Sequence, residues 1–253
     1  AESEGGSSMK TLRELAPVVY EDDTLIAFNK PSGLLIAPDR WDKTLENLMD
    51  MVHQQGSPDW FNVHRLDKST SGLVLCTKNK AALDVVCKAF ETREVEKTYM
   101  ALVRGCPSVH KGVISGPVGP GAQQPHRMRI TASGKPAETA FEVVERWHRL
   151  SLLHLWPHTG RTHQLRVHCA FMNCPIVADH MYGTERGLFL SDFKRKYKEG
   201  DGPERALIGR LALHAWKLTL KHPVTGEPLT IEAPPPKDFG AALRQLRRHG
   251  RAM

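Results

Sequence analysis

The feature that most constrains the fold is a set of short segments with the periodicity of β-strands. In residues 97–103 (KTYMALV), Tyr99, Ala101 and Val103 share one side of a predicted strand, and the intervening residues share the other. Residues 72–77 (GLVLCT) form a short apolar run that is typical of a buried strand. Further strands are predicted at residues 24–30, 139–145, 150–156, 213–220 and 229–231, the last two as a hairpin that turns at residues 222–227.

Few helices are predicted between these strands. Residues 44–53 place Leu45, Leu48 and Val52 on one face, with Thr44 as the expected N-cap. Asn79 is expected to cap a second helix, in which Leu83, Val86 and Phe90 recur at helical spacing, and a third is predicted to begin near Thr162. Residues 106–133 are rich in Gly and Pro and are predicted to be a long loop with a basic insertion (His126, Arg127, Arg129). Strands with few, scattered helices favour a mixed sheet.

Length and composition favour one large folded domain. The chain has 253 residues, of which 40% are hydrophobic and 25% charged, which is enough apolar material for a full core. Residues 1–15 are predicted to be a flexible N-terminus and residues 16–253 the folded domain. No apolar run approaches the roughly 18 residues of a membrane span, and the first residues do not resemble a secretion signal. Together with five irregularly spaced cysteines, this predicts a soluble, cytoplasmic protein with reduced thiols.

One short segment carries residues suited to catalysis. Residues 64–72 (HRLDKSTSG) lead into a predicted buried strand, where a carboxylate can be held rigidly. Ionised Asp67 could attack an electrophilic carbon or act as a base, and a nearby arginine would lower its pKa by about 1–3 units. By residue type alone, a loop salt bridge with Ser and Thr turn caps is the favoured explanation of the segment.

The same segment resembles the catalytic motif of the RluA-type pseudouridine synthases, and other stretches resemble further motifs of that family in the expected order. Those stretches are residues 28–33 (FNKPSG), 97–99 (KTY), 159–168 (TGRTHQLRVH) followed by 175–179 (PIVAD) and Tyr182-Gly183, and 213–215 (LHA). Together they span most of the chain. The resemblance implies an α+β fold with a mixed, mostly antiparallel sheet, flanking helices and a central catalytic cleft. The implied activity is an isomerase that converts uridine in RNA to pseudouridine.

The resemblance also implies roles for individual residues. Asp67 would be the catalytic carboxylate, Tyr99 a ring against the target base, and Arg166 the ion-pair partner of Asp67. Arg65 would enter the RNA stack, and further RNA contacts are expected from the other polar motif residues, His64, Lys97, Arg161 and His163. On the predicted helix, His163 and Arg166 share one face, whereas Leu165, Cys169 and Met172 share another that can meet the core.

No cofactor or metal is expected. An isomerisation gains or loses no electrons, and the glycine-rich residues 112–121 lack a nucleotide-binding pattern. A zinc cluster is not favoured because no CxxC or HExxH spacing connects the cysteines and histidines that might form one, namely Cys169, Cys174, His163, His168 and His180.

RNA is the expected partner. The formal net charge of +7 favours a polyanion, although a solvated cationic surface would give the same charge. Residues 194–198 (KRKYK) are expected to contact RNA, whereas residues 244–251 (RQLRRHGR) could do so or simply be solvated. No accessory N-terminal RNA-binding domain is expected, because few residues of the given sequence precede Tyr20. We therefore expect a monomer that acts on a stem-loop of ribosomal or transfer RNA and binds neither DNA nor membranes.

Two alternatives stay open at this point. A non-catalytic RNA-binding or ribosome-assembly protein could keep the fold without the chemistry, although Asp67, Tyr99 and Arg166 are all present. A metal-dependent RNA hydrolase would need a cluster of carboxylates or histidines that the sequence does not supply.

Overall fold

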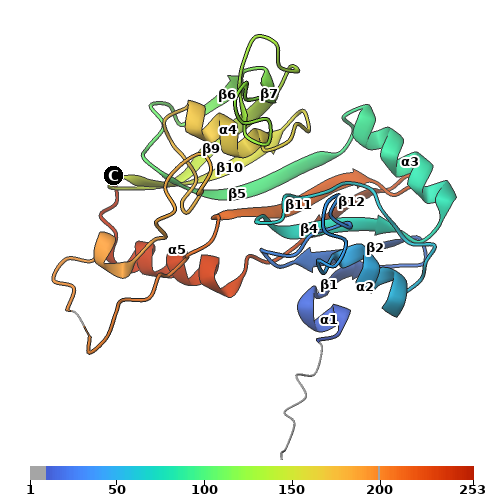
Figure 1. The fold of residues 1–253 in the computed structure, drawn as a ribbon, viewed down its shortest axis with the longest axis horizontal. Coiled ribbons are helices and arrows are strands. Elements are labelled where there is room, and N and C mark those ends of the chain that lie inside the picture. The colour runs from blue at the N-terminus through green and yellow to red at the C-terminus, as the bar shows by residue number, and fades with distance from the viewer. Residues whose placement is uncertain (1–9, 199) are drawn as a thin grey trace, which may run out of the picture.

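A computed structural model describes residues 10–198 and 200–253 and places a single large sheet at the centre of the chain (Figure 1). Its strands follow the order β1-β2-β4-β11-β5-β10-β9-β6, with β12 paired to β11 and β3 paired to β4. Of the described pairings in this sheet, only β11 with β4 is parallel. The bounds are β1 Val18–Glu21, β2 Leu25–Lys30, β3 Phe61–Asn62, β4 Ser71–Thr77, β5 Glu96–Arg104, β6 Lys111–Ser115, β9 Glu138–Trp147, β10 Leu150–Pro157, β11 Leu213–Lys221 and β12 Pro228–Glu232. The predicted α+β class with a mostly antiparallel mixed sheet is confirmed.

Helices flank the sheet without forming a continuous layer (Figure 1). They are α1 Leu12–Leu15, α2 Leu48–Gln55, α3 Lys80–Glu91, α4 Gln164–Phe171 and α5 Lys237–His249, with a 3-10 turn η1 at Leu190–Asp192. Asn79 caps α3 as predicted, since its side chain accepts the Ala82 amide. Within the described parts of the chain, every helix falls short of the length and apolarity that crossing a membrane requires.

Two predicted boundaries are wrong. Helix α2 begins at Leu48 and is capped by Asn47, because Thr44 is held in a turn by Asp42 and Leu45 is 36% exposed. The folded part also begins before Ala16. Helix α1 starts at Leu12, which is buried, and Thr11 and Glu14 form a capping box at its N-terminus. The rest of the predicted flexible N-terminus, residues 1–9, lies outside the described residues.

Several elements were not predicted, and the largest differences lie in two regions. The expected long loop at residues 106–133 contains β6 and a separate hairpin of β7 (Val118–Pro120) and β8 (Met128–Ile130). The basic residues expected in that loop lie at and beside the tip of this hairpin. Helix α5 follows the proline-rich stop after β12, and its Phe239, Ala242, Leu243 and Leu246 are buried at helical spacing.

The close approach of β4 to β11 depends on one glycine. Gly72 has φ +122°, and a Cβ atom there would lie 2.2 Å from the carbonyl oxygen of Ala215. It directly follows Ser71, which pairs with His214 of β11. This pairing fixes the point at which the loop carrying Asp67 enters the sheet.

Candidate catalytic cleft

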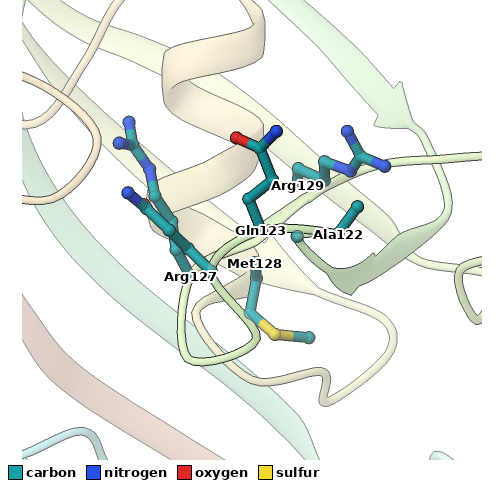
Figure 2. Close-up of a pocket in the computed structure, with 7 residues that line it drawn as sticks. Ala122, Gln123, Arg127, Met128 and Arg129 are labelled. Carbon is teal, nitrogen blue, oxygen red and sulfur yellow. The ribbon is translucent and has the colours of Figure 1, made fainter.

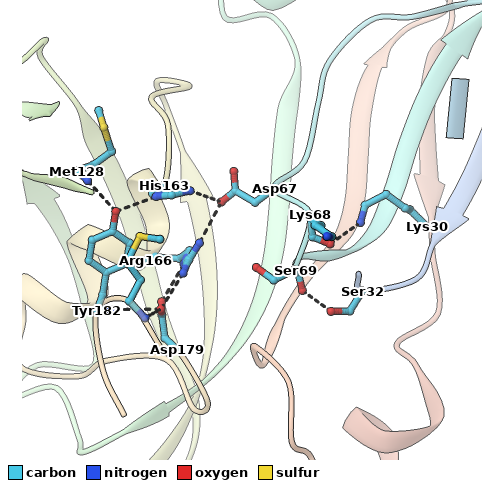
Figure 3. Close-up of polar contacts among 11 residues, drawn as sticks. Lys30, Ser32, Asp67, Lys68, Ser69, Met128, His163, Arg166, Asp179 and Tyr182 are labelled. Atoms are coloured by element: carbon cyan, nitrogen blue, oxygen red, sulfur yellow. Dashed lines mark hydrogen bonds and ion pairs between the residues drawn. The ribbon is translucent and has the colours of Figure 1, made fainter. Parts of the chain in front are cut away.

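Asp67 lies on the loop between β3 and β4, and hydrogen bonds from the segment 30–34 hold that loop in place (Figure 3). The Lys68 carbonyl accepts hydrogen bonds from the Gly33 amide at 2.7 Å and from Lys30 Nζ at 3.1 Å. Ser32 Oγ donates to the Ser69 carbonyl at 2.6 Å. The stretch FNKPSG therefore acts as the support of the loop that carries the carboxylate.

Lys30 is fully buried, and its ammonium is enclosed by carbonyl groups. Nζ donates to the carbonyl oxygens of Pro31 at 2.9 Å, Leu34 at 2.8 Å and Lys68 at 3.1 Å. Burial lowers the pKa of Lys30 to about 7, although the negative charge of Asp67 opposes this shift. The three acceptors match the three N–H bonds of an ammonium group, so Lys30 connects both chain segments at one point.

The exit of the loop is held by the predicted LHA element. The buried His214 bonds Ser71 Oγ through Nδ1 at 2.9 Å and the Ala233 carbonyl through Nε2 at 2.8 Å. Burial lowers the pKa of His214 to about 4, so the ring is neutral. Neutral His214 can donate only from Nε2 in this arrangement, and Ser71 therefore donates to Nδ1. The role of this motif is to hold the loop in place.

The Asp67 carboxylate faces two nitrogen groups at a distance. Its Oδ2 lies 3.9 Å from Arg166 Nη1 and 4.0 Å from His163 Nε2, and its side chain is 30% exposed. The predicted proximity of Asp67 and Arg166 is present, but neither distance is that of a hydrogen bond. The carboxylate is held by charge while its oxygens stay open to the cleft.

Besides its predicted ion pair with Asp67, Arg166 has a second and closer carboxylate partner, Asp179, which was not predicted. Arg166 Nε and Nη2 bond the two carboxylate oxygens of Asp179 at 2.9 and 2.8 Å, and both side chains are buried (Figure 3). Asp179 also accepts the amides of Met181 and Tyr182. Burial alone would raise the pKa of Asp179, but the bonds and charge of Arg166 hold it below its usual value. Asp179 orients Arg166 toward Asp67.

Tyr182 and His163 complete this side of the cleft. The Tyr182 hydroxyl accepts the Met128 amide at 2.9 Å and lies 2.7 Å from His163 Nδ1. The tyrosine can therefore donate its own proton to Nδ1, which leaves the imidazole proton on Nε2, facing Asp67. Burial lowers the pKa of His163 despite the opposing charge of Asp67, so the neutral ring is favoured at pH 7. The sequence stretches contained Asp179 and Tyr182, but no role was predicted for either.

The loop before α4 is fixed by Gln164, another residue for which no role was predicted. Its Oε1 accepts from Thr159 Oγ1 at 2.7 Å and from the Arg161 amide at 3.1 Å, and its Nε2 donates to Thr139 Oγ1 at 3.0 Å. Helix α4 consequently begins at Gln164, after His163 in a left-handed conformation. Leu165 and Cys169 pack into the core as predicted, but Arg166 is buried too, so the helix has no solvent-exposed face at that position.

These residues border a cleft of about 690 Å³. Tyr99 lines it from β5, and the raised pKa of its hydroxyl, caused by burial and by the charge of Asp67, keeps that group protonated. A cleft of this size is within the range that binds small ligands. The predicted central cleft is thus present, with Asp67, Tyr99 and Arg166 on its walls.

The predicted RNA contacts also border the cleft, but not all are free to bind. Arg65 is exposed, and Arg161 donates from Nε to the Pro136 carbonyl at 3.0 Å. Lys97 is half-buried, which lowers its pKa. His64 stacks on Phe90 and accepts the Leu75 amide on Nε2 at 3.0 Å. Because burial and the charge of Lys97 lower the pKa of His64 to about 3, its ring is neutral and is held against the sheet.

Another hollow, of about 410 Å³, lies at the β7–β8 hairpin (Figure 2). Gln123, Arg127 and Arg129 extend from the hairpin, and the Arg127 guanidinium lies 5.6 Å from the centre of the Tyr182 ring. The hairpin is therefore attached to the cleft through Tyr182. In residues 10–198 and 200–253, no three His, Cys, Asp or Glu side chains gather in a way that could hold a metal ion.

The chain is similar in sequence to pseudouridine synthases. Residues 24–171 match the family described as RNA pseudouridylate synthase. Ribosomal large subunit pseudouridine synthase D of Nitrosomonas europaea is 37% identical over 235 residues, which cover 91% of this chain and 65% of that protein. The dual-specificity RNA pseudouridine synthase RluA of Escherichia coli K12 is 36% identical over 219 residues, covering 86% of this chain and 92% of that protein.

Solved structures show the same similarity. Human RNA pseudouridylate synthase domain containing 1 has a TM-score of 0.67 and 29% identity, with 90% of this chain and 86% of that chain covered. Human RNA pseudouridylate synthase domain containing 4 has a TM-score of 0.69 and 25% identity, with 91% and 92% covered.

Proposed function

This chain belongs to the RNA pseudouridylate synthase family, and we propose that it converts uridines of ribosomal or transfer RNA to pseudouridine with Asp67 as the catalytic carboxylate. The observation that carries the proposal is the placement of Asp67. Its carboxylate is partly open to the cleft, within 4.0 Å of Arg166 and His163, on a loop that buried Lys30 supports. An ionised carboxylate held in this way can act as a nucleophile or a base.

The reaction is an isomerisation in which atoms and electrons balance within the RNA. The bond between N1 of uracil and C1′ of ribose breaks, the base turns while it stays bound, and C5 joins C1′. One proton leaves C5 and one is taken up at N1. The chain's own residues supply the carboxylate, the positive charge of Arg166 beside it, and a protonated Tyr99 against which the base can lie.

The target base must leave its stack to reach Asp67. Tyr99 offers the flipped uracil an aromatic surface, and such stacking contributes about 1–3 kcal/mol per base. A uridine in a loop loses fewer stacking and pairing contacts than one in a duplex, which favours a stem-loop substrate. Arg65, two residues before Asp67, is exposed at the border of the cleft, and its proposed role is to enter the RNA stack.

The proposal is tested by tritium release from RNA labelled at C5 of uridine, in the presence of EDTA. We expect release together with pseudouridine on nucleoside analysis. A non-catalytic RNA-binding protein would bind the RNA without release. A metal-dependent hydrolase would cleave strands, and EDTA would abolish the cleavage. The substrate is labelled RNA from cells that lack the protein, so that the target uridine is unmodified. If the purified protein released no tritium from this RNA, the proposed activity would be contradicted.

A further inference from the structure

Three basic segments that are far apart in the sequence meet at the end of the sheet opposite the cleft. The turn between β9 and β10 carries Arg146 and Arg149, and the η1 segment is followed by Lys194. The end of α5 and the residues after it contribute Arg244, Arg248 and Arg251. We call these six residues the distal basic surface.

Backbone contacts bring the segments together. The chain after α5 returns to the β9–β10 turn, where the His148 amide donates to the Arg251 carbonyl at 2.9 Å and the Met253 amide to the Arg146 carbonyl at 3.3 Å. Trp147 and Ala252 form a β-bridge between these hydrogen bonds. In Figure 1 the orange segment near residue 190 lies beside the C-terminal end of α5. Burial and the charges of Lys194 and Arg248 lower the pKa of His249 there.

The positive charge of this surface is not neutralised within the described chain. Glu145 at the edge of the turn is already paired with Arg247 at 2.6 Å, and Asp192 of η1 with Arg186 at 2.7 Å. For residues 10–198 and 200–253, no ion pair involves any of the six residues of the distal basic surface. Arg149, Arg244, Arg248 and Arg251 are exposed. Such a cluster raises the local concentration of anions.

The distance from the cleft follows from β10. This strand starts at Leu150 beside the basic turn and ends at Pro157, which lines the cleft. Seven residue steps of about 3.3 Å place the two ends about 23 Å apart. An RNA whose uridine lies at Asp67 would have to extend at least that far to reach the distal basic surface.

We propose that the distal basic surface binds the phosphate backbone of the substrate RNA outside the target stem-loop. The inference rests on the proposed function, which supplies the polyanion. Exposed arginines outside any ion pair of the described residues suit phosphate contacts, which add affinity without reading sequence. The cleft then selects the uridine, while this surface favours targets within a longer structured RNA.

Two synthetic RNAs test the proposal by fluorescence anisotropy: a short hairpin, and the same hairpin with its stem extended by about 20 base pairs. The variant Arg244→Gln/Arg248→Gln/Arg251→Gln is compared with the wild type. We expect about tenfold weaker binding of the extended hairpin at moderate salt and unchanged binding of the short one. The slope of log affinity against log salt should fall by roughly 2 to 3 for the extended hairpin.

A matched control removes the same charge elsewhere. The variant Lys10→Gln/Lys43→Gln/Lys221→Gln changes exposed lysines before α1, before α2 and at the end of β11, and should bind the extended hairpin within about twofold of the wild type. The variant Arg146→Gln/Arg149→Gln/Lys194→Gln changes the other two segments and leaves α5 intact. It should show the same loss of affinity for the extended hairpin, which would exclude misfolding of α5 as the cause. Equal binding of the extended hairpin by all variants would overturn the proposal. That is also the result expected if the surface binds an acidic protein and not RNA. Failure of the proposed function would appear separately, as absent tritium release by the wild type.

Discussion

Removal of the Asp179 carboxylate is predicted to destabilise the fold far more than removal of the Asp67 carboxylate. Asp179 is fully buried and makes two bonds of 2.8 and 2.9 Å to Arg166, whereas Asp67 is partly exposed and lies 3.9 Å from Arg166. Breaking a buried pair costs about 3–5 kcal/mol because the remaining charge stays buried without a partner. A partly exposed pair contributes about 0–1 kcal/mol.

These free energies translate into separate thermal and pH effects. For a chain of this size, Asp179→Asn should lower the melting temperature by about 6–20 °C and Asp67→Asn by at most about 4 °C. The lowered pKa of Asp179 means that its stabilising contribution is present above about pH 4 and is lost as the pH falls through the folded-state value. The wild type should therefore lose stability in acid more steeply than Asp179→Asn.

Urea denaturation at pH 7 measures the effect, with Arg166→Met and the two double variants completing thermodynamic cycles. We expect a coupling free energy above about 2 kcal/mol between Arg166 and Asp179, and below about 1 kcal/mol between Arg166 and Asp67. Equal destabilisation by Asp67→Asn and Asp179→Asn would refute this account, because it would make Asp67 as important a partner of Arg166 as Asp179.

Three further substitutions test other parts of the site. Gly72→Ala should lower the free energy of unfolding by several kcal/mol, because the Cβ of the alanine would lie 2.2 Å from the Ala215 carbonyl oxygen. A melting curve like that of the wild type would show that β4 and β11 can move apart at no cost. Tyr99→Phe should keep the affinity for a stem-loop, whereas Tyr99→Ala should lose about 1–3 kcal/mol of it, and equal affinities in a filter-binding titration would remove the ring from the base site. Arg65→Ala should weaken productive binding of folded RNA more than that of an unstructured strand, and normal kinetics on both would exclude its predicted entry into the stack.

The strands could be predicted because their side chains alternate and their runs are long. Residues 97–103 and 150–156 lie within β5 and β10, which carry Tyr99 and the edge of the cleft. The β7–β8 hairpin was missed because each of its strands has only three residues, too few to show a period. Helix α5 was missed because a proline-rich stretch precedes it and basic residues dominate its exposed face.

The proximity of Asp67 to Arg166 could be predicted, but the closer pair of Arg166 with Asp179 could not. Spacing places Arg166 on the helix face that looks toward the cleft, yet both Asp67 and Asp179 are compatible with that spacing. Only the folded chain shows that the backbone amides of Met181 and Tyr182 fix Asp179 against Arg166. Similarly, His64 looked free to bind RNA until the Leu75 amide proved to occupy its Nε2.

The central claim is that the chemistry depends on the carboxylate of Asp67, and Asp67→Asn tests it most directly. Affinity for RNA comes largely from Lys and Arg contacts to phosphate, which this change leaves in place, whereas an amide is a far poorer nucleophile or base. Asp59→Asn, at an exposed position, is the matched control. Tritium release and filter binding are measured on the same preparations, with mass spectrometry excluding deamidation. We predict no release by Asp67→Asn, unchanged RNA affinity and a fully active control; substantial release by Asp67→Asn would contradict the assignment.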